Sequence, residues 1–456
     1  DTFSFVEPPS DSWYPSYVDN GGNGLYDIYI SKLSPGYYGW VMPESYAFHN
    51  SGDNEKSPDI TEQNALTSYM EIRNNYNGFQ NTEIENIQVT AAHEFFHAIQ
   101  FGYDGWEKTW LLEATAVWME DEVFDDVNDY YQYLQIWFNE PHVALDYSPY
   151  HNYNPNYNPE FDTGGNSRHW YGSCIFFRYI SEHIGDYSLI RTIFENSILY
   201  NSYEADYTIT TIDEILSKHG SDFKETLQKM AVANRVLSSD PIVGEYSYKE
   251  AENYKAYGVE LNIEASISIP DSPYAYISDD NLMRYASHYL QINPVNIPIE
   301  VTFFPDDLSS SFQVSGILEK KGGEVMVIPI GTSRILPGSD YIDEITISVM
   351  ADDTKGLTNS YSLVLSKYPE GIVLYPCYPN PFWDTTTFSF YIPHQEQVSL
   401  ILYDILGRRV DEIVNKEYIK GYNMVSFTHR YLPSGIYIAQ IKTGNTIKNQ
   451  KITLIK

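Results

Sequence analysis

The pattern of apolar and polar positions divides the chain into a helical first part and a strand-rich second part. Residues 25–30 (LYDIYI) follow a Gly/Asn turn and predict a strand, whereas residues 109–124 and 169–185 are apolar over helical lengths. Long polar loops separate these elements. The mixture predicts an α+β first domain over residues 1–235.

Residues 82–102 (TEIENIQVTAAHEFFHAIQFG) carry the clearest helical pattern. Thr82 and Glu85 have the spacing of a capping box, and Gly102 stands where the helix would end. The predicted helix presents one apolar stripe, made of Ile84, Ile87, Ala91, Phe95 and Ala98. We therefore expect a capped helix over the whole range.

From about residue 250 the chain changes to short runs that alternate or stay apolar over strand lengths, with Gly, Pro and Asp turns between them. This pattern predicts one β-sandwich over residues 250–367 and a second over residues 373–456. Residues 373–456 contain 9 Lys and Arg and 6 Asp and Glu. The rest of the chain contains 19 Lys and Arg and 56 Asp and Glu, and this difference in charge supports a separate last domain. The predicted fold class is therefore multidomain: an α+β domain followed by two all-β sandwich domains.

Net charge and apolar runs limit the kinds of partner. The 456 residues carry a formal net charge of −34, which opposes phosphate backbones and anionic membranes, so no nucleic acid is expected as a partner. No run approaches the roughly 18 apolar residues of a membrane helix, so no transmembrane segment is expected. Cys174 and Cys377 stand in dissimilar surroundings, and a bridge between them is not expected.

An H-E-x-x-H motif, His93-Glu94-Phe95-Phe96-His97, lies within the predicted helix. Residues four apart on an α-helix differ by about 40° in azimuth and about 6 Å along the axis, so both histidines can reach one ion. Glu94 lies about 100° round from His93, where its carboxylate can hold a water without binding the metal. This arrangement is typical of zinc hydrolases, in which a carboxylate takes a proton from an activated water.

A catalytic zinc ion needs a third protein ligand. Glu113 follows His97 within the apolar stretch WLLEATAVWM (110–119), where an unpaired carboxylate would be costly to bury. A nearby metal would supply the missing charge. The alternative is that Glu113 points to solvent, and Asp104 and Glu107 are then the fallback ligands.

The sequence also suggests roles for residues near the three predicted zinc ligands. Glu120, Asp121 and Glu122 are interpreted as the solvated end of the second helix. Tyr171, at the start of the third predicted helix, is the candidate side-chain donor to an oxyanion. His169 is the alternative donor, against the simpler interpretation of a surface or hydrogen-bonded histidine.

Two polar segments leave other interpretations open. In residues 19–27 (DNGGNGLYD), Asp19, Asn23 and Asp27 have the spacing of three calcium-loop ligands, but the other ligand positions hold Gly and Ile, which favours a plain turn. Residues 148–167 are rich in Asn, Pro and Tyr. They could line a cleft, although a solvated loop is the default.

The H-E-x-x-H motif, WLLEATAVW around Glu113 and YGSCIFFRYISEHIG from Tyr171 together resemble gluzincin-type zinc metallopeptidases. The similarity is greatest to a family of secreted bacterial metallopeptidases that carry HEFFHAIQFGYD, and it covers about residues 15–235. It implies a zincin-like fold and a protein or peptide substrate. It also implies Zn²⁺ held by His93, His97 and Glu113, with Glu94 as the general base.

Two positions depart from the pattern of these peptidases. Ala114 stands where a small Gly usually follows the ligand glutamate. Val117 stands where the thermolysin-like branch has an Asp four residues after that glutamate. The residue that would orient a ligand histidine is therefore unassigned.

The last part of the chain resembles a type A sorting domain of the type IX secretion system. The similarity is carried, in order, by YPNPF (378–382), LYDILGRRV (402–410), LPSGIYIAQIKTG (432–444) and KITLIK (451–456). It implies export across both membranes of a Bacteroidetes-like bacterium, with the secretion machinery as a partner. The expected location is extracellular or at the cell surface.

Two other classes of function stay open. The protein could be a surface adhesion or binding protein with a catalytically idle peptidase fold, or a zinc hydrolase of non-peptide substrates, because a fold and a metal site do not fix the substrate. Glu94 favours an enzyme, because an idle descendant would not need the base. Neither the substrate preference nor the oligomeric state follows from the sequence.

Overall fold

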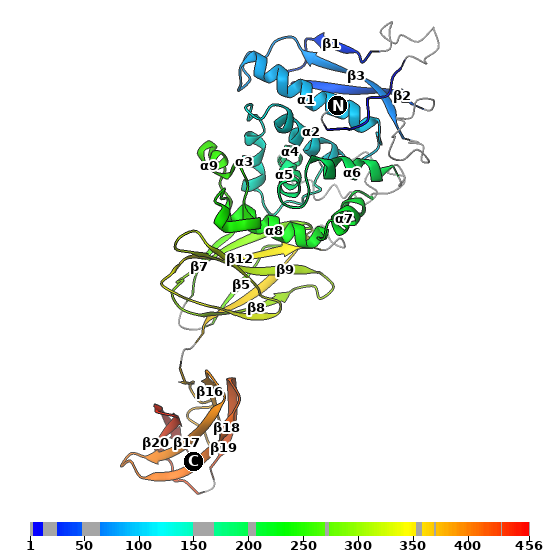
Figure 1. The fold of residues 1–456 in the computed structure, drawn as a ribbon. Helices are drawn as coiled ribbons and strands as arrows, with labels where there is room; N and C mark the ends of the chain where they lie inside the picture. The colour runs from blue at the N-terminus through cyan, green and yellow to red at the C-terminus, as the bar shows by residue number, and fades with distance from the viewer. Residues whose placement is uncertain are drawn as a thin grey trace.

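The computed structural model describes residues 3–11, 25–47, 64–148, 168–198, 207–269, 273–352, 358–368, 371–429 and 431–455. Within them, three hydrophobic cores follow one another along the chain. In the ribbon, a mainly helical part is followed by two strand-rich parts (Figure 1). The predicted multidomain organisation is therefore confirmed. Asp19, Asn23 and nearly all of the predicted 148–167 loop lie outside the described residues. None of the described helices combines the length and the apolar character that crossing a membrane requires.

The first domain combines a three-stranded sheet with a group of helices. The strands lie in the order β1 (Ile28–Ser31), β3 (Leu66–Arg73) and β2 (Gly39–Tyr46), with β1 parallel and β2 antiparallel to β3. Helix α1 (Glu83–Phe101) packs against β3 and β2 (Figure 1). The other helices are α2 (Thr109–Val123), α3 (Tyr131–Asn139), α4 (His169–Gly172), α5 (Cys174–His183), α6 (Tyr187–Ser197), α7 (Thr208–Lys218), α8 (Phe223–Val236), the 3-10 helix η2 (Pro241–Tyr246) and α9 (Ala251–Tyr257).

Helix α1 confirms the predicted capping box, since the Thr82 hydroxyl accepts from the Glu85 amide and the Glu85 carboxylate accepts from the Thr82 amide. The predicted apolar stripe, however, is not the buried face. Ile84, Ile87 and Phe95 are exposed. The buried face is largely polar, and it consists of Asn86, Val89, Thr90, Glu94, Phe96, Ala98 and Gln100.

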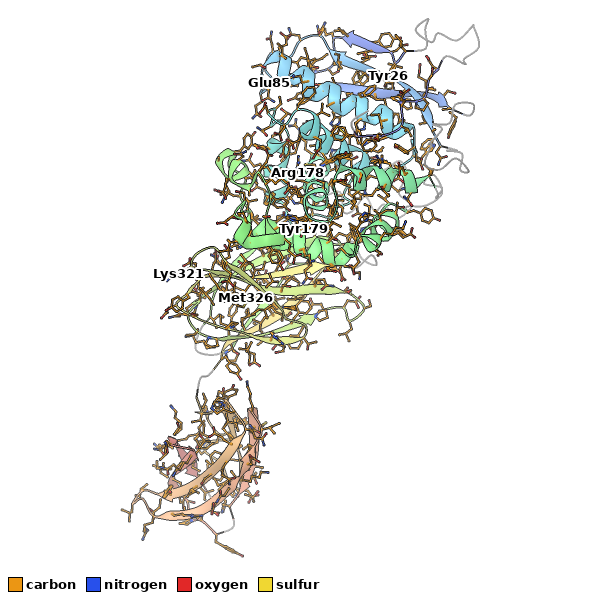
Figure 2. All side chains as sticks on the ribbon, viewed as in Figure 1. Tyr26, Glu85, Arg178, Tyr179, Lys321 and Met326 are labelled. Atoms are coloured by element: carbon orange, nitrogen blue, oxygen red, sulfur yellow. The ribbon has the colours of Figure 1, made fainter. Side chains whose placement is uncertain are left out.

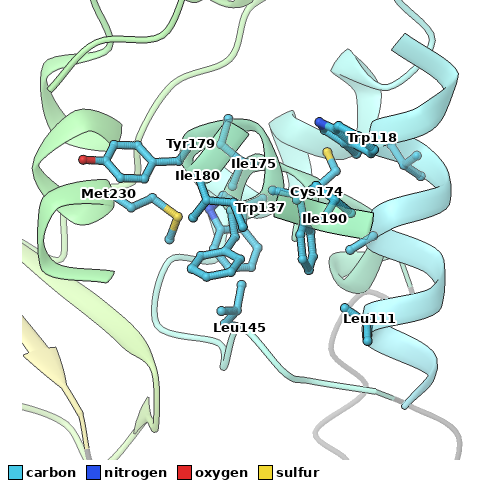
Figure 3. Packing of buried hydrophobic residues seen from close by; sticks show 14 of the residues in the cluster. Leu111, Trp118, Trp137, Leu145, Cys174, Ile175, Tyr179, Ile180, Ile190 and Met230 are labelled. Atoms are coloured by element: carbon cyan, nitrogen blue, oxygen red, sulfur yellow. The ribbon is translucent and has the colours of Figure 1, made fainter. Parts of the chain in front are cut away.

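Helix α2 runs through the centre of the first core and is buried on nearly every side. Figure 3 shows part of this core, to which Leu111 and Trp118 of α2 and Cys174 of α5 contribute. The helix predicted over 169–185 is divided into α4 and α5. Between them the Ser173 hydroxyl donates to the Leu145 carbonyl at 2.9 Å.

The middle domain consists of two sheets that enclose the second core. One sheet has the order β10 (Val325–Pro329), β9 (Phe312–Lys320), β12 (Ile342–Ala351), β7 (Ala286–Asn293) and β4 (Ala265–Ser268). The other has the order β11 (Ser333–Leu336), β8 (Ile299–Pro305), β14 (Tyr361–Lys367) and β5 (Tyr274–Ile277), and β6 (Leu282–Met283) pairs with β13 (Thr358–Asn359). The expected start of this domain at residue 250 needs correction, because Ala251 and Tyr254 of α9 belong to the first core.

The first and middle domains are joined through helix α8. Arg235 donates to Thr346 of β12 at 2.7 Å and forms an ion pair with Glu319 of β9 at 2.9 Å. Tyr289 of β7 donates to the Ala231 carbonyl at 2.9 Å. In Figure 2 side chains fill this boundary between the helices and the sheet.

The C-terminal domain is a small sandwich around the third core. One sheet has the order β15 (Val373–Leu374), β16 (Thr385–Ile392) and β19 (Gly421–Thr428). The other has the order β18 (Arg409–Tyr418), β17 (Glu396–Asp404), β20 (Gly435–Thr443) and β21 (Thr446–Leu454). Cys377 is buried here, whereas Cys174 is buried in the first core, and both thiols are free.

Candidate metal centre

Helices α1 and α2 bring the three predicted metal ligands together. One ligand atom each from His93, His97 and Glu113 lies within 4.8 Å of the others. The Glu113 Oε2 atom is 3.2 Å from His93 Nε2 and 3.6 Å from His97 Nε2. Glu113 therefore points toward the histidines, and the alternative that it faces bulk solvent is wrong.

These separations fit a tetrahedral metal site. Zinc binds nitrogen and oxygen ligands at about 2.0–2.2 Å, so two ligand atoms of a tetrahedron lie about 3.3 Å apart. The two distances to Glu113 Oε2 lie close to this value. Two imidazoles and one carboxylate are also a donor set that zinc accepts, with one position left for water or substrate.

The outer nitrogen of each histidine ring is held by a polar side chain. His93 Nδ1 is 2.6 Å from Glu120 Oε1, and His97 Nδ1 is 2.7 Å from Gln100 Oε1. Gln100 donates its amide to the Leu112 carbonyl at 2.9 Å, so its oxygen must accept from His97. The Nε2 atom of His97 is therefore the nitrogen that faces the Glu113 carboxylate, and either a proton or a metal ion between them would link the two groups.

Glu120 corrects the interpretation of residues 120–122 as a solvated helix end. Glu120 and Asp121 are buried, because α2 continues through the core to Val123. Asp121 forms an ion pair with Arg178 of α5. Glu120 lies seven residues after Glu113, which places both carboxylates on one face of the helix. This spacing is the sequence signal that identifies the missing partner of His93.

The pKa values of Glu120, Glu113 and His93 are shifted by burial and by the contacts among these side chains. Burial raises the pKa of Glu120 to about 7, against the hydrogen bond from His93. Burial opposes ionisation of Glu113 too, but the neighbouring imidazoles outweigh it and hold the pKa of this carboxyl well below its usual range. For His93, burial lowers the pKa, whereas the hydrogen bonds to Glu113 and Glu120 raise it, with a net rise well above the usual value.

Glu94 is buried beside the three ligands without being one of them. Burial raises the pKa of its carboxyl, and the two motif histidines oppose the rise. Strand β2 begins against this side chain: a Cβ on Gly39 would lie 2.9 Å from Glu94 Cγ and 2.8 Å from Thr90 Cγ2. Only glycine allows the strand to approach this closely, so β2 and α1 fix Glu94 between them.

A pocket of about 320 Å³ opens next to His93 and Glu94. Its walls come from the β1–β2 connection and from α1, α2, α3 and α4. Besides His93 and Glu94, the lining residues include Tyr37, Tyr38, Glu120, Asp129, Tyr133, Arg168, Trp170 and Tyr171. The pocket thus shares His93 with the predicted ligand set, and Glu94 lies beside it on the same wall.

Tyr171 lies in this pocket, and its ring centroid is 6.0 Å from that of His93. The ring packs against Tyr133 of α3 at a centroid distance of 4.9 Å. His169, the alternative donor, is fully buried and stacks on Trp137 at 4.5 Å. Burial lowers the pKa of His169 to about 3, so the ring is a neutral part of the core.

The fallback ligands Asp104 and Glu107 are buried away from the ligand set. Asp104 accepts from the Trp106 amide at 2.8 Å, and Glu107 accepts from the Thr208 hydroxyl at 3.0 Å. Both carboxylates cap or brace the connection between α1 and α2. They are not needed as ligands, because Glu113 already faces both histidines.

Solved structures that match this chain include three β-glucuronidases, to which the similarity is weak. Faecalibacterium prausnitzii β-glucuronidase is 12% identical over 37% of this chain and 36% of that chain, with a TM-score of 0.15. Bacteroides uniformis β-glucuronidase 3 is 12% identical over 37% and 26%, with a TM-score of 0.16, and Ruminococcus gnavus β-glucuronidase is 13% identical over 40% and 34%, with a TM-score of 0.15. The matches span about a third or less of those enzymes and carry no argument about fold or activity.

The comparison with curated proteins finds no match. Residues 376–456 match the family described as the secretion system C-terminal sorting domain. The matched range holds all of the third core and its two sheets except Ile372 and strand β15, which precede it. The resemblance noted for this part of the sequence is thus confirmed. The C-terminal segment is a sorting domain of type IX secretion, which indicates a secreted or surface-attached protein.

Proposed function

We propose that the first domain is a zinc-dependent peptidase that is exported by means of its C-terminal sorting domain. The observation that carries the proposal is the electrostatics of the ligand set. His93 Nδ1 and Nε2 each face a carboxylate, and His97 Nε2 faces Glu113. In place of the protons on these rings, one metal ion between the three side chains would satisfy all of them at once.

A zincin-like fold is part of this proposal. In support, α1 carries the two histidines beneath a sheet, and the following helix α2 returns the third ligand. Zinc bound there would supply a Lewis acid that acidifies water and polarises a carbonyl oxygen. Glu120 and Gln100 would hold the two rings with Nε2 inward.

The remaining roles fall on residues beside the ligands. Glu94 would accept a proton from the attacking water and pass it to the leaving amine, for which its raised pKa is suited. Its position against Gly39 keeps the carboxylate from swinging away. Tyr171 would donate to the developing oxyanion, because it lies within the same pocket as His93 and Glu94.

Metal content and peptide cleavage of Glu94→Gln test the proposal. We expect wild type and variant each to bind one zinc ion per chain, while the variant loses at least about a hundredfold in kcat. Glu83→Gln is the matched control, because Glu83 lies exposed in the first turn of the same helix. Wild-type protein that binds no zinc, or a Glu94→Gln variant as active as wild type, would contradict the proposal.

A further inference from the structure

The pocket beside His93 and Glu94 has an acidic interior. Asp129 lines it, and only 3% of this residue is exposed. Its carboxylate accepts from Asn81 at 2.7 Å, from Gln132 at 2.9 Å and from the Tyr38 hydroxyl at 3.4 Å. All three donors are neutral, so these hydrogen bonds fix the position of the carboxylate without cancelling its charge.

Further carboxylates line the same space. Glu94 and Glu120 are both buried at the wall that the pocket shares with the ligand set. Together with Glu113 and Asp129 they carry more negative charge, when ionised, than one divalent ion neutralises. Arg168 also lines the pocket, at an exposed position, and adds one positive charge. When all four carboxylates are ionised they still outnumber the charges of one divalent ion and this guanidinium, which makes the interior a region of negative potential.

Aromatic rings form much of the remaining wall. Tyr37 and Tyr38 contribute from the β1–β2 connection, Tyr133 from α3, and Trp170 and Tyr171 from α4. The faces of tyrosine and tryptophan rings attract cations within about 6 Å. A long side chain with an apolar stem and a cationic head would thus meet rings along its length and carboxylates at its end.

The wall formed by the β1–β2 connection is held in place. Arg73 of β3 donates to the Tyr37 carbonyl, and the Tyr76 hydroxyl donates to the Tyr38 carbonyl at 3.3 Å. The Tyr38 ring packs edge-on against Phe79 at 4.4 Å. Because these contacts come from β3 and from the segment that follows it, the pocket keeps its shape without a ligand.

We propose that this pocket binds the side chain of a lysine or arginine next to the scissile bond, with Asp129 as the residue that determines the preference. This inference rests on the proposed peptidase activity and adds its substrate class. The charge of the enzyme agrees with it: outside residues 373–456, the chain has 19 Lys and Arg against 56 Asp and Glu. Basic peptides would be drawn toward the cleft, whereas acidic ones would be repelled.

The test uses zinc-loaded full-length protein and a peptide set that differs only at one position, which is lysine, arginine, norleucine, glutamine or glutamate. Each peptide is made with that residue on either side of the scissile bond, and cleavage sites are read by mass spectrometry. We expect kcat/KM for lysine or arginine to exceed that for norleucine by about tenfold or more on one side of the bond. Glutamate should be the poorest residue there.

Two variants assign the preference to its residue. Asp129→Asn keeps the volume and removes the charge, and we expect the ratio of lysine to norleucine to fall to about one. Asp126→Asn is the control, because Asp126 is exposed three residues earlier and does not line the pocket. Its ratio should equal that of wild type.

The outcomes separate this inference from the activity on which it rests. Cleavage of the peptides without a basic preference overturns the inference and leaves the peptidase proposal intact. No cleavage of any peptide overturns both. A basic preference that survives in Asp129→Asn refutes the role of Asp129. If that variant does not fold, the wild-type preference alone decides whether the pocket binds cations.

Discussion

Replacing Glu120 with glutamine tests whether this residue orients a metal ligand. The change keeps the size of the side chain and removes the charge that His93 Nδ1 faces at 2.6 Å. The amide oxygen of the variant could still accept one hydrogen bond, but a neutral acceptor polarises the ring less than a carboxylate does. His93 would then be a weaker and less firmly oriented ligand.

The size of the effect follows from the burial and the geometry. Loss of a partner that orients a metal ligand typically costs 10- to 100-fold in metal affinity, about 1.4–2.7 kcal/mol. The 2.6 Å separation and the burial of Glu120 place our expectation in the upper half of this range. Metal-free stability should change by less than about 1 kcal/mol, because burial already disfavours the charged Glu120 and raises its pKa to about 7.

The assay is competition for zinc against a chromophoric chelator, combined with urea unfolding of the metal-free protein. Glu122→Gln is the control, because Glu122 lies on the same helix but pairs with Arg178 at 3.0 Å. We expect its zinc affinity to equal that of wild type. Zinc affinity of Glu120→Gln within about threefold of wild type would refute the positioning role. An equal loss of metal-free stability and zinc affinity would show a purely structural one.

Three further outcomes are expected. In metal-free protein, the raised pKa of His93 stabilises the fold fully below pH 6.5, the usual pKa of histidine, and this stabilisation is lost as pH rises through the folded-state pKa. The lowered pKa of Glu113 stabilises the fold fully above pH 4.5, and this stabilisation is lost as pH falls. Urea unfolding across pH should show the alkaline loss in wild type but not in His93→Asn. Gly39→Ala should lower the free energy of unfolding by about 1–3 kcal/mol and reduce peptide cleavage, measured by thermal melting and kinetics, because its Cβ would collide with Thr90 and Glu94. Removal of residues 373–456 should leave zinc affinity and the melting of the remaining domains unchanged in calorimetry, because that segment has its own core.

Local patterns were enough to predict the helix that carries the motif. The capping box at Thr82 and the spacing of His93 and His97 depend only on residues within a few turns. Glu113 could be proposed because a carboxylate among apolar residues needs a partner. Each of these arguments uses one helix at a time, and the structure brings the three ligands together.

The partners of the histidines required knowledge of how two helices pack. Glu120 meets His93 because α2 packs against α1 and stays buried as far as Asp121. The run of acidic residues at 120–122 instead predicts a solvated helix end. Asp129 and the 35–39 connection come to the same pocket from different parts of the chain. No spacing rule links such positions, so the pocket could not be predicted before the fold was known.

The buried face of α1 explains why its hydrophobic pattern misled. Asn86, Thr90 and Gln100 are buried, and each makes a hydrogen bond of its own: Asn86 donates to the Asn81 carbonyl at 2.8 Å, Thr90 to the Asn86 carbonyl at 2.6 Å, and Gln100 to the Leu112 carbonyl at 2.9 Å. Apolar side chains at these positions could be buried equally well, and they would need no hydrogen-bond partners. Of these three side chains, Gln100 is the one that also orients a predicted ligand, by accepting from His97 Nδ1.

That orientation has a consequence for metal uptake. Because Glu120 and Gln100 already hold both rings with Nε2 toward Glu113, binding a metal requires the loss of protons rather than a rearrangement of side chains. The raised pKa of His93 means that a proton occupies part of the place that the metal would take. Zinc affinity should therefore rise with pH across the range in which His93 titrates, with release of protons on binding. Proton release on addition of zinc would distinguish a metal site from a cluster that only braces two helices, because the brace would keep its protons.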